Sequence, residues 1–435
     1  MEKIGIFGSF FYQNLAFTLQ AYNQKQSKKI FKIIEKNKDK FYFLGYIKYE
    51  FYKYLKNKNY TSKEPFVYFL AFKERIKFNE ENENLDFCPI FTQDLNQKKY
   101  FTDFNKVKKA IANGKSYQVN LTQELHFKSN LNLYKSFINL YPKQNTQFKA
   151  YIKNEFLELA SFSPELFFKI KNNTITTKPM KGTIKRSKIQ DEDEKFKYFL
   201  KNNEKIISEN VMIVDLLRND LSKIIVKNTQ KTDLFIVKSY PTLHQLISKI
   251  SGKLKKNINF FDIFKALFPC GSITGAPKIE TIDFIEKLEK RKRGIYCGAI
   301  GLIHKEKAKF SVAIRTIEKK HKDNFYRYGV GGGIVWDSKK NEEFEELKLK
   351  TEILRNDFHL FETMFYKNGK ILFFKEHLQR IIKSAKFFNF DSKNLKNDFK
   401  TILFLKDKKL NFESLSDFNN FVFNNVFFFI ESSFE

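Results

Sequence analysis

The chain has 435 residues, enough to bury a large core, and this length predicts two or three domains or one large domain with an appendage. Its formal net charge is +30, but the 79 basic residues are overwhelmingly lysine and are spread along the whole chain. Direct readers of nucleic acid rely on arginine and concentrate their charge on one face, so no nucleic-acid partner is predicted. Three cysteines without metal or disulfide spacing, no secretory leader and no long uncharged run predict a cytoplasmic protein without a membrane partner.

The first half of the chain has the pattern of a mixed α and β protein. Residues 1–100 carry short aromatic runs separated by stretches rich in lysine, asparagine and glutamate, which predict the strands and helices of a smaller N-terminal lobe. A helix is predicted over residues 104–116, ending near Gly114. Residues 116–127 and 148–162 are typical of strands.

Three further helices bear on function. The first is predicted from about Ser208, with Glu209 in its first turn and an apolar stripe made by Val211, Val214, Leu217 and Leu221. The second follows Pro277, with its apolar positions at Ile279, Ile282, Ile285 and Leu288. The third has Asn341 as its expected cap, with Glu343, Glu346 and Lys350 on one face.

Glycines are concentrated in one part of the chain. Nine of the sixteen fall between Gly271 and Gly333. Glycine is needed where φ is positive or where the backbone approaches a ligand without a Cβ in the way, and both needs arise where main-chain N–H groups hold an anion. The pattern therefore predicts a site for a small, negatively charged ligand.

Beyond residue 356 the pattern changes. A two-strand signal around Asn368 and Gly369 is followed by an amphipathic helix. About 80 residues are few for an independent domain.

Seven segments together carry a resemblance to a known family. In chain order they are SPELFF, KPMKGTIKR, ENVMIVDLLRNDL, FPCGSITGAPKIETI, RGIYCGAIGLI, FSVAIRTIE and GGGIVWD. They resemble the chorismate-utilising enzymes, and the resemblance covers residues 101–355. It implies the α+β fold of that family, with two packed antiparallel sheets and outer helices. The implied organisation is an N-terminal lobe over 1–100 and a chorismate-binding catalytic region over 101–356.

The remaining residues, 357–435, resemble the opening portion of a class IV aminotransferase of the lyase type that acts on aminodeoxychorismate. The segment with the Schiff-base lysine of that family would lie beyond the end of this chain. No lyase activity is therefore predicted from residues 357–435.

Within the chorismate-utilising family, Lys181 and the segment YQVNLTQ resemble the branch that converts chorismate and ammonia to 4-amino-4-deoxychorismate, on the path to para-aminobenzoate and folate. That branch takes its ammonia from a glutamine amidotransferase partner, and this chain has no glutaminase motif of its own. Anthranilate synthase component I, which usually carries alanine at the position of Lys181, is the nearest alternative. Salicylate and isochorismate synthases are more distant ones, and a basic scaffold protein with a decayed active site belongs to another class.

The resemblance implies three catalytic residues. Lys181 would attack C2 of the chorismate ring, Glu165 would protonate the departing C4 hydroxyl, and His244 would lie near the ring and transfer a proton. Each has a plainer interpretation from its residue type alone. Lys181 is one surface lysine among many, Glu165 caps a strand end, and His244 is a structural histidine.

The same resemblance implies a Mg²⁺ cofactor held by Glu209 and Glu346, since hard carboxylate oxygens suit this cation. The alternatives are a first-turn helix carboxylate for Glu209 and a surface ion pair of Glu346 with Lys350. Ile206 departs from the family pattern, which usually has an acidic residue there.

Two groups of residues are implied to hold the two carboxylates of chorismate. The enolpyruvyl carboxylate would be bound by Tyr296, Arg315, Gly331, Gly332, Gly333 and Lys350. The ring carboxylate would be bound by Thr274, Gly275 and Ala276. Arginine suits a planar carboxylate because its guanidinium can donate two parallel hydrogen bonds.

Overall fold

The computed structural model describes residues 3–79, 87–187, 189–240, 243–355, 360–367, 370–387 and 426–432. The chain divides into two compact units, and each is described by itself. The first holds residues 1–85, 93–126 and 131–353, and the second holds residues 86–92, 127–130 and 354–435. Every predicted site residue belongs to the first unit.

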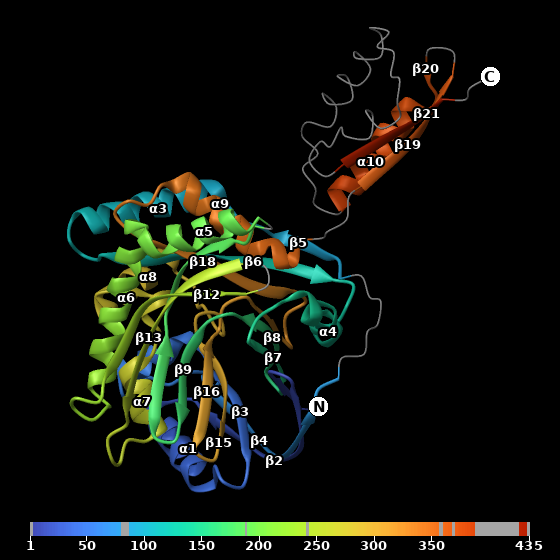
Figure 1. Ribbon diagram of the computed structural model, residues 1–435. Helices are drawn as coiled ribbons and strands as arrows, with labels where there is room; N and C mark the ends of the chain where they lie inside the picture. Colours follow the sequence, from blue (N-terminus) through green and yellow to red (C-terminus); the bar gives the residue numbers. More distant parts are fainter. Residues whose placement is uncertain are drawn as a thin grey trace. The chain divides into compact units, whose positions relative to one another are not determined.

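Helices and strands alternate along the chain as a mixed α and β pattern predicts (Figure 1). The helices up to residue 354 are α1 (Gln24–Asn37), η1 (Tyr49–Phe51), α2 (Tyr52–Lys56), α3 (Gln97–Ala112), α4 (Leu133–Lys143), α5 (Gln190–Asn202), α6 (Glu204–Ser222), α7 (Phe260–Leu267), η2 (Gly271–Ile273), α8 (Lys278–Glu289), α9 (Lys340–Thr351) and η3 (Glu352–Leu354). The strands up to that point are β1 (Ile4–Phe7), β2 (Phe10–Ala21), β3 (Tyr42–Ile47), β4 (Val67–Lys77), β5 (Pro89–Gln93), β6 (Gln118–Ser129), β7 (Phe148–Lys153), β8 (Leu157–Ser163), β9 (Leu166–Lys171), β10 (Thr174–Lys178), β11 (Met180–Lys185), β12 (Lys231–Ser239), β13 (Leu243–Lys253), β14 (Gly275–Ala276), β15 (Ala299–His304), β16 (Lys307–Val312), β17 (Thr316–Lys320) and β18 (Tyr326–Ile334).

The strands of the first unit form an antiparallel sheet that folds over on itself. One half follows the pairing order β12, β13, β10, β9, β16, β15, β3, β4 and β2, with β11 also paired to β13. The other half continues through β1, β7, β8, β17 and β18, and then through β6 to β14. Buried side chains from both halves, such as Leu44 and Leu70 on one side and Ile152 and Leu159 on the other, share one apolar cluster. The predicted α+β class and the two packed antiparallel layers are confirmed.

The outer face of the first half is covered by helices. Phe31 of α1 stacks on Phe264 of α7 at a ring separation of 5.4 Å, and Phe264 lies 5.3 Å from Phe168 of β9. Apolar residues of α6 belong to the same cluster. N-terminal residues such as Phe31 therefore share a core with the catalytic region, and the predicted boundary at residue 100 falls inside α3.

Three helix details differ from the sequence prediction. Helix α6 begins earlier, at Glu204, because the side chain of Asn203 caps it and accepts from the N–H of Ile206 at 3.0 Å. The predicted stripe residues Val211 and Ile279 are 44% and 61% exposed, so the apolar period holds only for the more C-terminal positions of α6 and α8. Helix α9 is capped at Lys339, which places Asn341 inside the helix.

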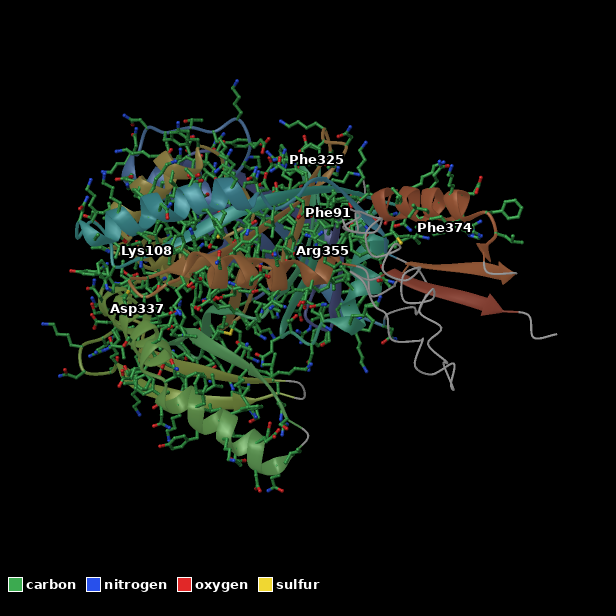
Figure 2. The ribbon with its side chains drawn as sticks, turned by 90° about the horizontal axis from the view of Figure 1, so that it is seen from above. Phe91, Lys108, Phe325, Asp337, Arg355 and Phe374 are labelled. Atoms are coloured by element: carbon green, nitrogen blue, oxygen red, sulfur yellow. The ribbon has the colours of Figure 1, made fainter. Side chains whose placement is uncertain are left out.

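The second unit contains a small sheet and a helix. Strand β19 (Leu360–Lys367) pairs antiparallel with β20 (Lys370–Ile371) and parallel with β21 (Val426–Ser432), and α10 (Phe374–Phe387) follows β20. The predicted hairpin and helix are confirmed, although the turn at Asn368 and Gly369 lies outside the described residues. Within this unit the guanidinium of Arg355 lies over the ring of Phe91 at 4.2 Å (Figure 2). None of the helices in the described ranges is long and apolar enough to cross a membrane.

Candidate active site

Lys181 lies on β11, opposite Leu246 of β13, at an irregularity in the strand pairing. The irregularity falls at Gly182, whose φ of +74° favours glycine. The Lys181 Nζ donates a hydrogen bond to Glu209 Oε2 of α6 at 3.1 Å, and the two side chains are only 15% and 19% exposed. The amine is therefore withdrawn from bulk solvent and contacts one of the two predicted metal ligands.

The glycine strand β18 passes beside this amine. A Cβ built on Gly333 would lie 3.3 Å from Lys181 Nζ and 3.2 Å from the side-chain amide of Gln118. A Cβ on Gly332 would lie 3.4 Å from Glu343 Oε2 and 3.9 Å from Lys350 Nζ. The bare backbone of β18 thus lets an amine, an amide and a carboxylate approach the same strand, as the glycine pattern predicted for a ligand site.

Glu165 directly precedes β9 and is 6% exposed. Its Oε1 accepts a hydrogen bond from Ser272 Oγ at 2.6 Å. Burial raises the pKa of Glu165 above its usual value, while the Ser272 hydrogen bond and the positive charges of Lys181 and Lys350 oppose that shift. A carboxyl that keeps its proton to higher pH, within the electrostatic reach of Lys181, is suited to general-acid chemistry.

Helix α9 brings a second lysine and two carboxylates to β18. Lys350 Nζ donates to the carbonyl of Gly331 at 2.8 Å and pairs with Glu346 Oε1 at 2.7 Å. Although burial acts to raise it, the pKa of Glu346 is held below its usual value by the charges of Lys350, Lys181 and Lys205. Burial raises the pKa of Glu343, and the nearby charges of Glu346 and Glu209 add to the shift. The three glutamates therefore share one electrostatic neighbourhood.

The predicted metal ligands are oriented toward lysines. Glu209 pairs with Lys181 and Glu346 with Lys350. The residues that the structure describes contain no cluster of three or more His, Cys, Asp or Glu side chains arranged to hold a metal ion. Glu209 and Glu346 both act on the pKa of Glu343, so their charges lie close enough together to suit a hard divalent cation.

The residues predicted for the enolpyruvyl carboxylate lie around β18. Burial raises the pKa of Tyr328 to about 12 against the opposing charge of Arg315. The Tyr328 phenol donates to the Lys350 carbonyl at 2.9 Å. No carboxylate of the described ranges forms an ion pair with Arg315. Tyr296 is 7% exposed, and a Cβ on Gly329 would lie 2.2 Å from its ring.

Gly275 lies in the short strand β14, which pairs with β6. Its φ is +149°, and a Cβ on it would lie 1.8 Å from the Gln118 carbonyl oxygen. The neighbouring Thr274 hydroxyl donates to the Cys270 carbonyl at 2.9 Å, and the Ala276 carbonyl accepts from the Tyr117 N–H at 2.7 Å. Glycine is required here for close approach to β6, and β6 carries Gln118.

The substitution Gly275→Ala is expected to lower the free energy of unfolding by at least about 2 kcal/mol, because the new Cβ meets a backbone atom at a positive φ. Urea unfolding followed by circular dichroism measures the change. Gly114→Ala is the matched control: its φ of +68° carries backbone strain, but its Cβ meets nothing within 4 Å. Equal losses for the two variants would contradict the close-approach argument.

His244 of β13 is fully buried, and both of its ring nitrogens are engaged. Nδ1 lies 2.8 Å from Ser239 Oγ, and Nε2 lies 2.8 Å from Asp193 Oδ1 of α5. Asp193 is also bound by Arg186 at 2.8 Å, and this hydrogen bond with the one from His244 holds the pKa of Asp193 well below its usual value. These contacts tie β13 to α5 and favour the structural interpretation of His244, while the proton transfer that the resemblance implies stays a prediction.

His244→Ala is therefore expected to lower the melting temperature while changing kcat by less than about twofold in the folded protein, because no group that acts on a substrate is removed. Thermal unfolding and steady-state kinetics below the transition measure the two effects. A variant with an unchanged melting temperature and a lost kcat would restore the catalytic interpretation.

Three residues of this site were not assigned a role from sequence: Gln118, Ser272 and Glu343. Gln118 is fully buried, and neither its Nε2 nor its Oε1 has a hydrogen-bond partner within the described part of the chain. The sequence signal that contained it is the segment YQVNLTQ of the family resemblance, because β6 is buried from Gln118 to Gln123 without alternation. Ser272 and Glu343 became recognisable only through their contacts with Glu165 and Gly332.

Comparison with known proteins identifies the family of the chain. Residues 77–356 match the model of the chorismate binding enzyme family, so the chain belongs to this family. Residues 359–415 match the amino-transferase class IV family model. The chain is 34% identical over 278 residues to aminodeoxychorismate synthase component 1 of Escherichia coli K12, covering 63% of this chain and 61% of that protein.

Other relatives carry different names. The chain is 34% identical over 268 residues to anthranilate synthase component 1 of Saccharolobus solfataricus, covering 61% of this chain and 63% of that protein. The chain thus spans less than two thirds of the length of both relatives. The crystal structure of anthranilate synthase component I from Streptococcus pneumoniae TIGR4 superposes with a TM-score of 0.69 at 21% identity, over 81% of this chain and 92% of that one. This similarity confirms the predicted fold.

Proposed function

We propose that this chain aminates chorismate at C4 and produces 4-amino-4-deoxychorismate. The observation that carries the proposal is the withdrawn amine of Lys181, held against Glu209 and beside the bare backbone of Gly333. The similarity to aminodeoxychorismate synthase component 1 supports it further. The site also has the charges needed for a doubly negative substrate, namely Lys350 and Arg315.

The proposed reaction has two displacements. In its neutral form the Lys181 amine forms a bond to C2 of the ring while the bond from C4 to its hydroxyl breaks, and Glu165 gives its proton to the departing oxygen, which leaves as water. Ammonia then bonds to C4 and the bond from C2 to Lys181 breaks, which restores the free amine. The C4 ammonium returns a proton to Glu165, so the catalyst ends in its starting state.

Glu209 and Glu346 are the residues that would hold Mg²⁺, which when bound would neutralise the ring carboxylate of the substrate. Lys181 is hydrogen-bonded to Glu209 in the structure, so the amine has a defined position before substrate arrives. Gln118 offers an unpartnered neutral amide next to Lys181 and Gly333, and it can orient an incoming ammonia without acting as a base.

The ammonia is proposed to come from a glutamine amidotransferase subunit. The word component in the name of the Escherichia coli relative supports a partner of this kind. A cytoplasmic location stays a prediction from the sequence.

The decisive experiment incubates the purified chain with chorismate, Mg²⁺ and ammonium, and identifies the product by mass and retention time. Formation of 4-amino-4-deoxychorismate supports the proposal. Anthranilate with pyruvate would assign the chain to the alternative branch, in agreement with the Saccharolobus relative. No conversion of chorismate under these conditions would favour the decayed scaffold.

A further inference from the structure

Glu165 is held by a short chain of side chains that the reaction scheme does not use. Ser272 Oγ donates to Glu165 Oε1 at 2.6 Å, and Cys270 Sγ lies 3.2 Å from the same hydroxyl. Glu165 and Cys270 are each 6% exposed. These linked side chains therefore connect the loop at η2 with the carboxyl group at the start of β9.

The two oxygens of Glu165 have different surroundings. Oε1 is occupied by the Ser272 hydroxyl, whereas Oε2 has no hydrogen-bond partner in the described ranges and is not sealed from solvent. A carboxyl oxygen that accepts a hydrogen bond is disfavoured as the site of the proton, since the proton and the donor would compete for the same lone-pair region. The free oxygen is then the one that carries the transferable proton.

The Cys270 thiol determines which groups donate in the hydrogen bonds that link it to Ser272 and Glu165. Burial, together with the charge of Glu165, raises the pKa of the Cys270 thiol to about 12, so this thiol keeps its proton at neutral pH. An S–H that points to Ser272 Oγ leaves the hydroxyl proton of Ser272 free to point to Glu165. The thiol thus donates to the Ser272 hydroxyl, and the hydroxyl donates to the carboxyl oxygen of Glu165.

We propose that Ser272 is a positioning residue that fixes Glu165 Oε1 as an acceptor and so assigns the acid proton to Oε2. The inference rests on the proposed function, in which Glu165 is the general acid. The hydroxyl acts through Glu165 and needs no contact with the substrate. The groups that face Glu165 are Ser272 and Cys270 from the η2 loop, Lys181 from β11 and Lys350 from α9.

The test compares Ser272→Ala with Ser272→Thr, which restores a hydroxyl, and with Ser311→Ala, which removes a buried hydroxyl bonded to the Ile300 carbonyl. Because the Ser272 hydrogen bond lowers the pKa of Glu165, Ser272→Ala is expected to move the basic limb of the kcat profile about one pH unit higher. Its kcat at the optimum is expected to fall about tenfold, with KM for chorismate within about twofold. Ser272→Thr is expected to restore both values, and Ser311→Ala is expected to resemble wild type.

A second measurement does not depend on turnover. Infrared difference spectroscopy follows the carboxyl band of Glu165 through a pH titration, with Glu165→Gln used to assign that band. A higher titration midpoint in Ser272→Ala supports the inference even if the wild-type product turns out to be anthranilate. An unchanged midpoint would overturn the inference. A raised KM with unchanged kcat would also overturn it and would make Ser272 a substrate contact. A failure of the proposed function itself shows separately, as a wild-type chain that forms no 4-amino-4-deoxychorismate.

Discussion

Lys181→Ala is expected to lower kcat for amino-product formation by about 10³-fold or more, because the covalent route through C2 loses its nucleophile. Steady-state assays with chorismate, Mg²⁺ and ammonium measure the loss. The protein is expected to remain folded, since the lost ion pair with Glu209 lies at the edge of the core. Lys185→Ala, an exposed lysine of the same strand β11, is the matched control and is expected to retain wild-type turnover.

Mass spectrometry adds a direct test of the intermediate. Wild-type protein given chorismate without ammonia is expected to accumulate an adduct on the peptide that contains Lys181. Full amino-product formation by Lys181→Ala would refute the covalent mechanism. Loss of activity without any adduct in the wild type would reassign the amine to substrate binding.

Glu165→Gln is expected to reduce kcat by about 10²- to 10⁴-fold, the usual contribution of a general acid, while keeping the shape of the side chain. In wild type the acid must be protonated, so kcat is expected to decline as pH rises through the raised pKa of Glu165. The pH dependence of kcat therefore has a basic limb that the variant lacks. Glu342→Gln, an exposed glutamate of α9 whose Oε1 accepts from Lys339 at 3.0 Å, is the control.

The same shift has a consequence for stability. Because the folded-state pKa of Glu165 is raised, the native protein binds a proton that the unfolded chain releases, and stability falls as pH rises from the ordinary glutamate pKa to the raised one. Above that window the buried charge destabilises the fold, and Glu165→Gln removes this charge. The variant is thus expected to be inactive yet at least as stable as wild type at neutral pH. A variant that is both active and less stable would contradict the acid role.

Residue types, their spacing and the family resemblance supplied the candidate reactive groups of this protein from sequence. The glycines between Gly271 and Gly333 indicated a backbone that must approach other groups closely, and the structure finds such approaches at Gly275 and Gly333. Lys181 and Glu209 are 28 positions apart in the sequence and were both candidate site residues, and the structure brings them within 3.1 Å. Such features are local in sequence, because φ preference and side-chain chemistry belong to single residues and short segments.

The partners of each group depended on the tertiary structure. His244 matched a family position, yet burial between Ser239 and Asp193 engages both of its nitrogens. Gln118 lies next to Gly333, and Ser272 contacts Glu165. In each pair the two residues are more than a hundred positions apart in sequence, so only the fold brings them together.

The sequence by itself determined the α+β class and the family and supplied the candidate site residues, since hydrophobic period, glycine placement and motif order are properties of the chain alone. Only the tertiary structure decided which carboxyl is buried beside Ser272, which lysine contacts which glutamate and which side chains surround His244. The reason is that burial, charge neighbours and hydrogen-bond partners come from segments that the sequence separates and the antiparallel sheet brings together.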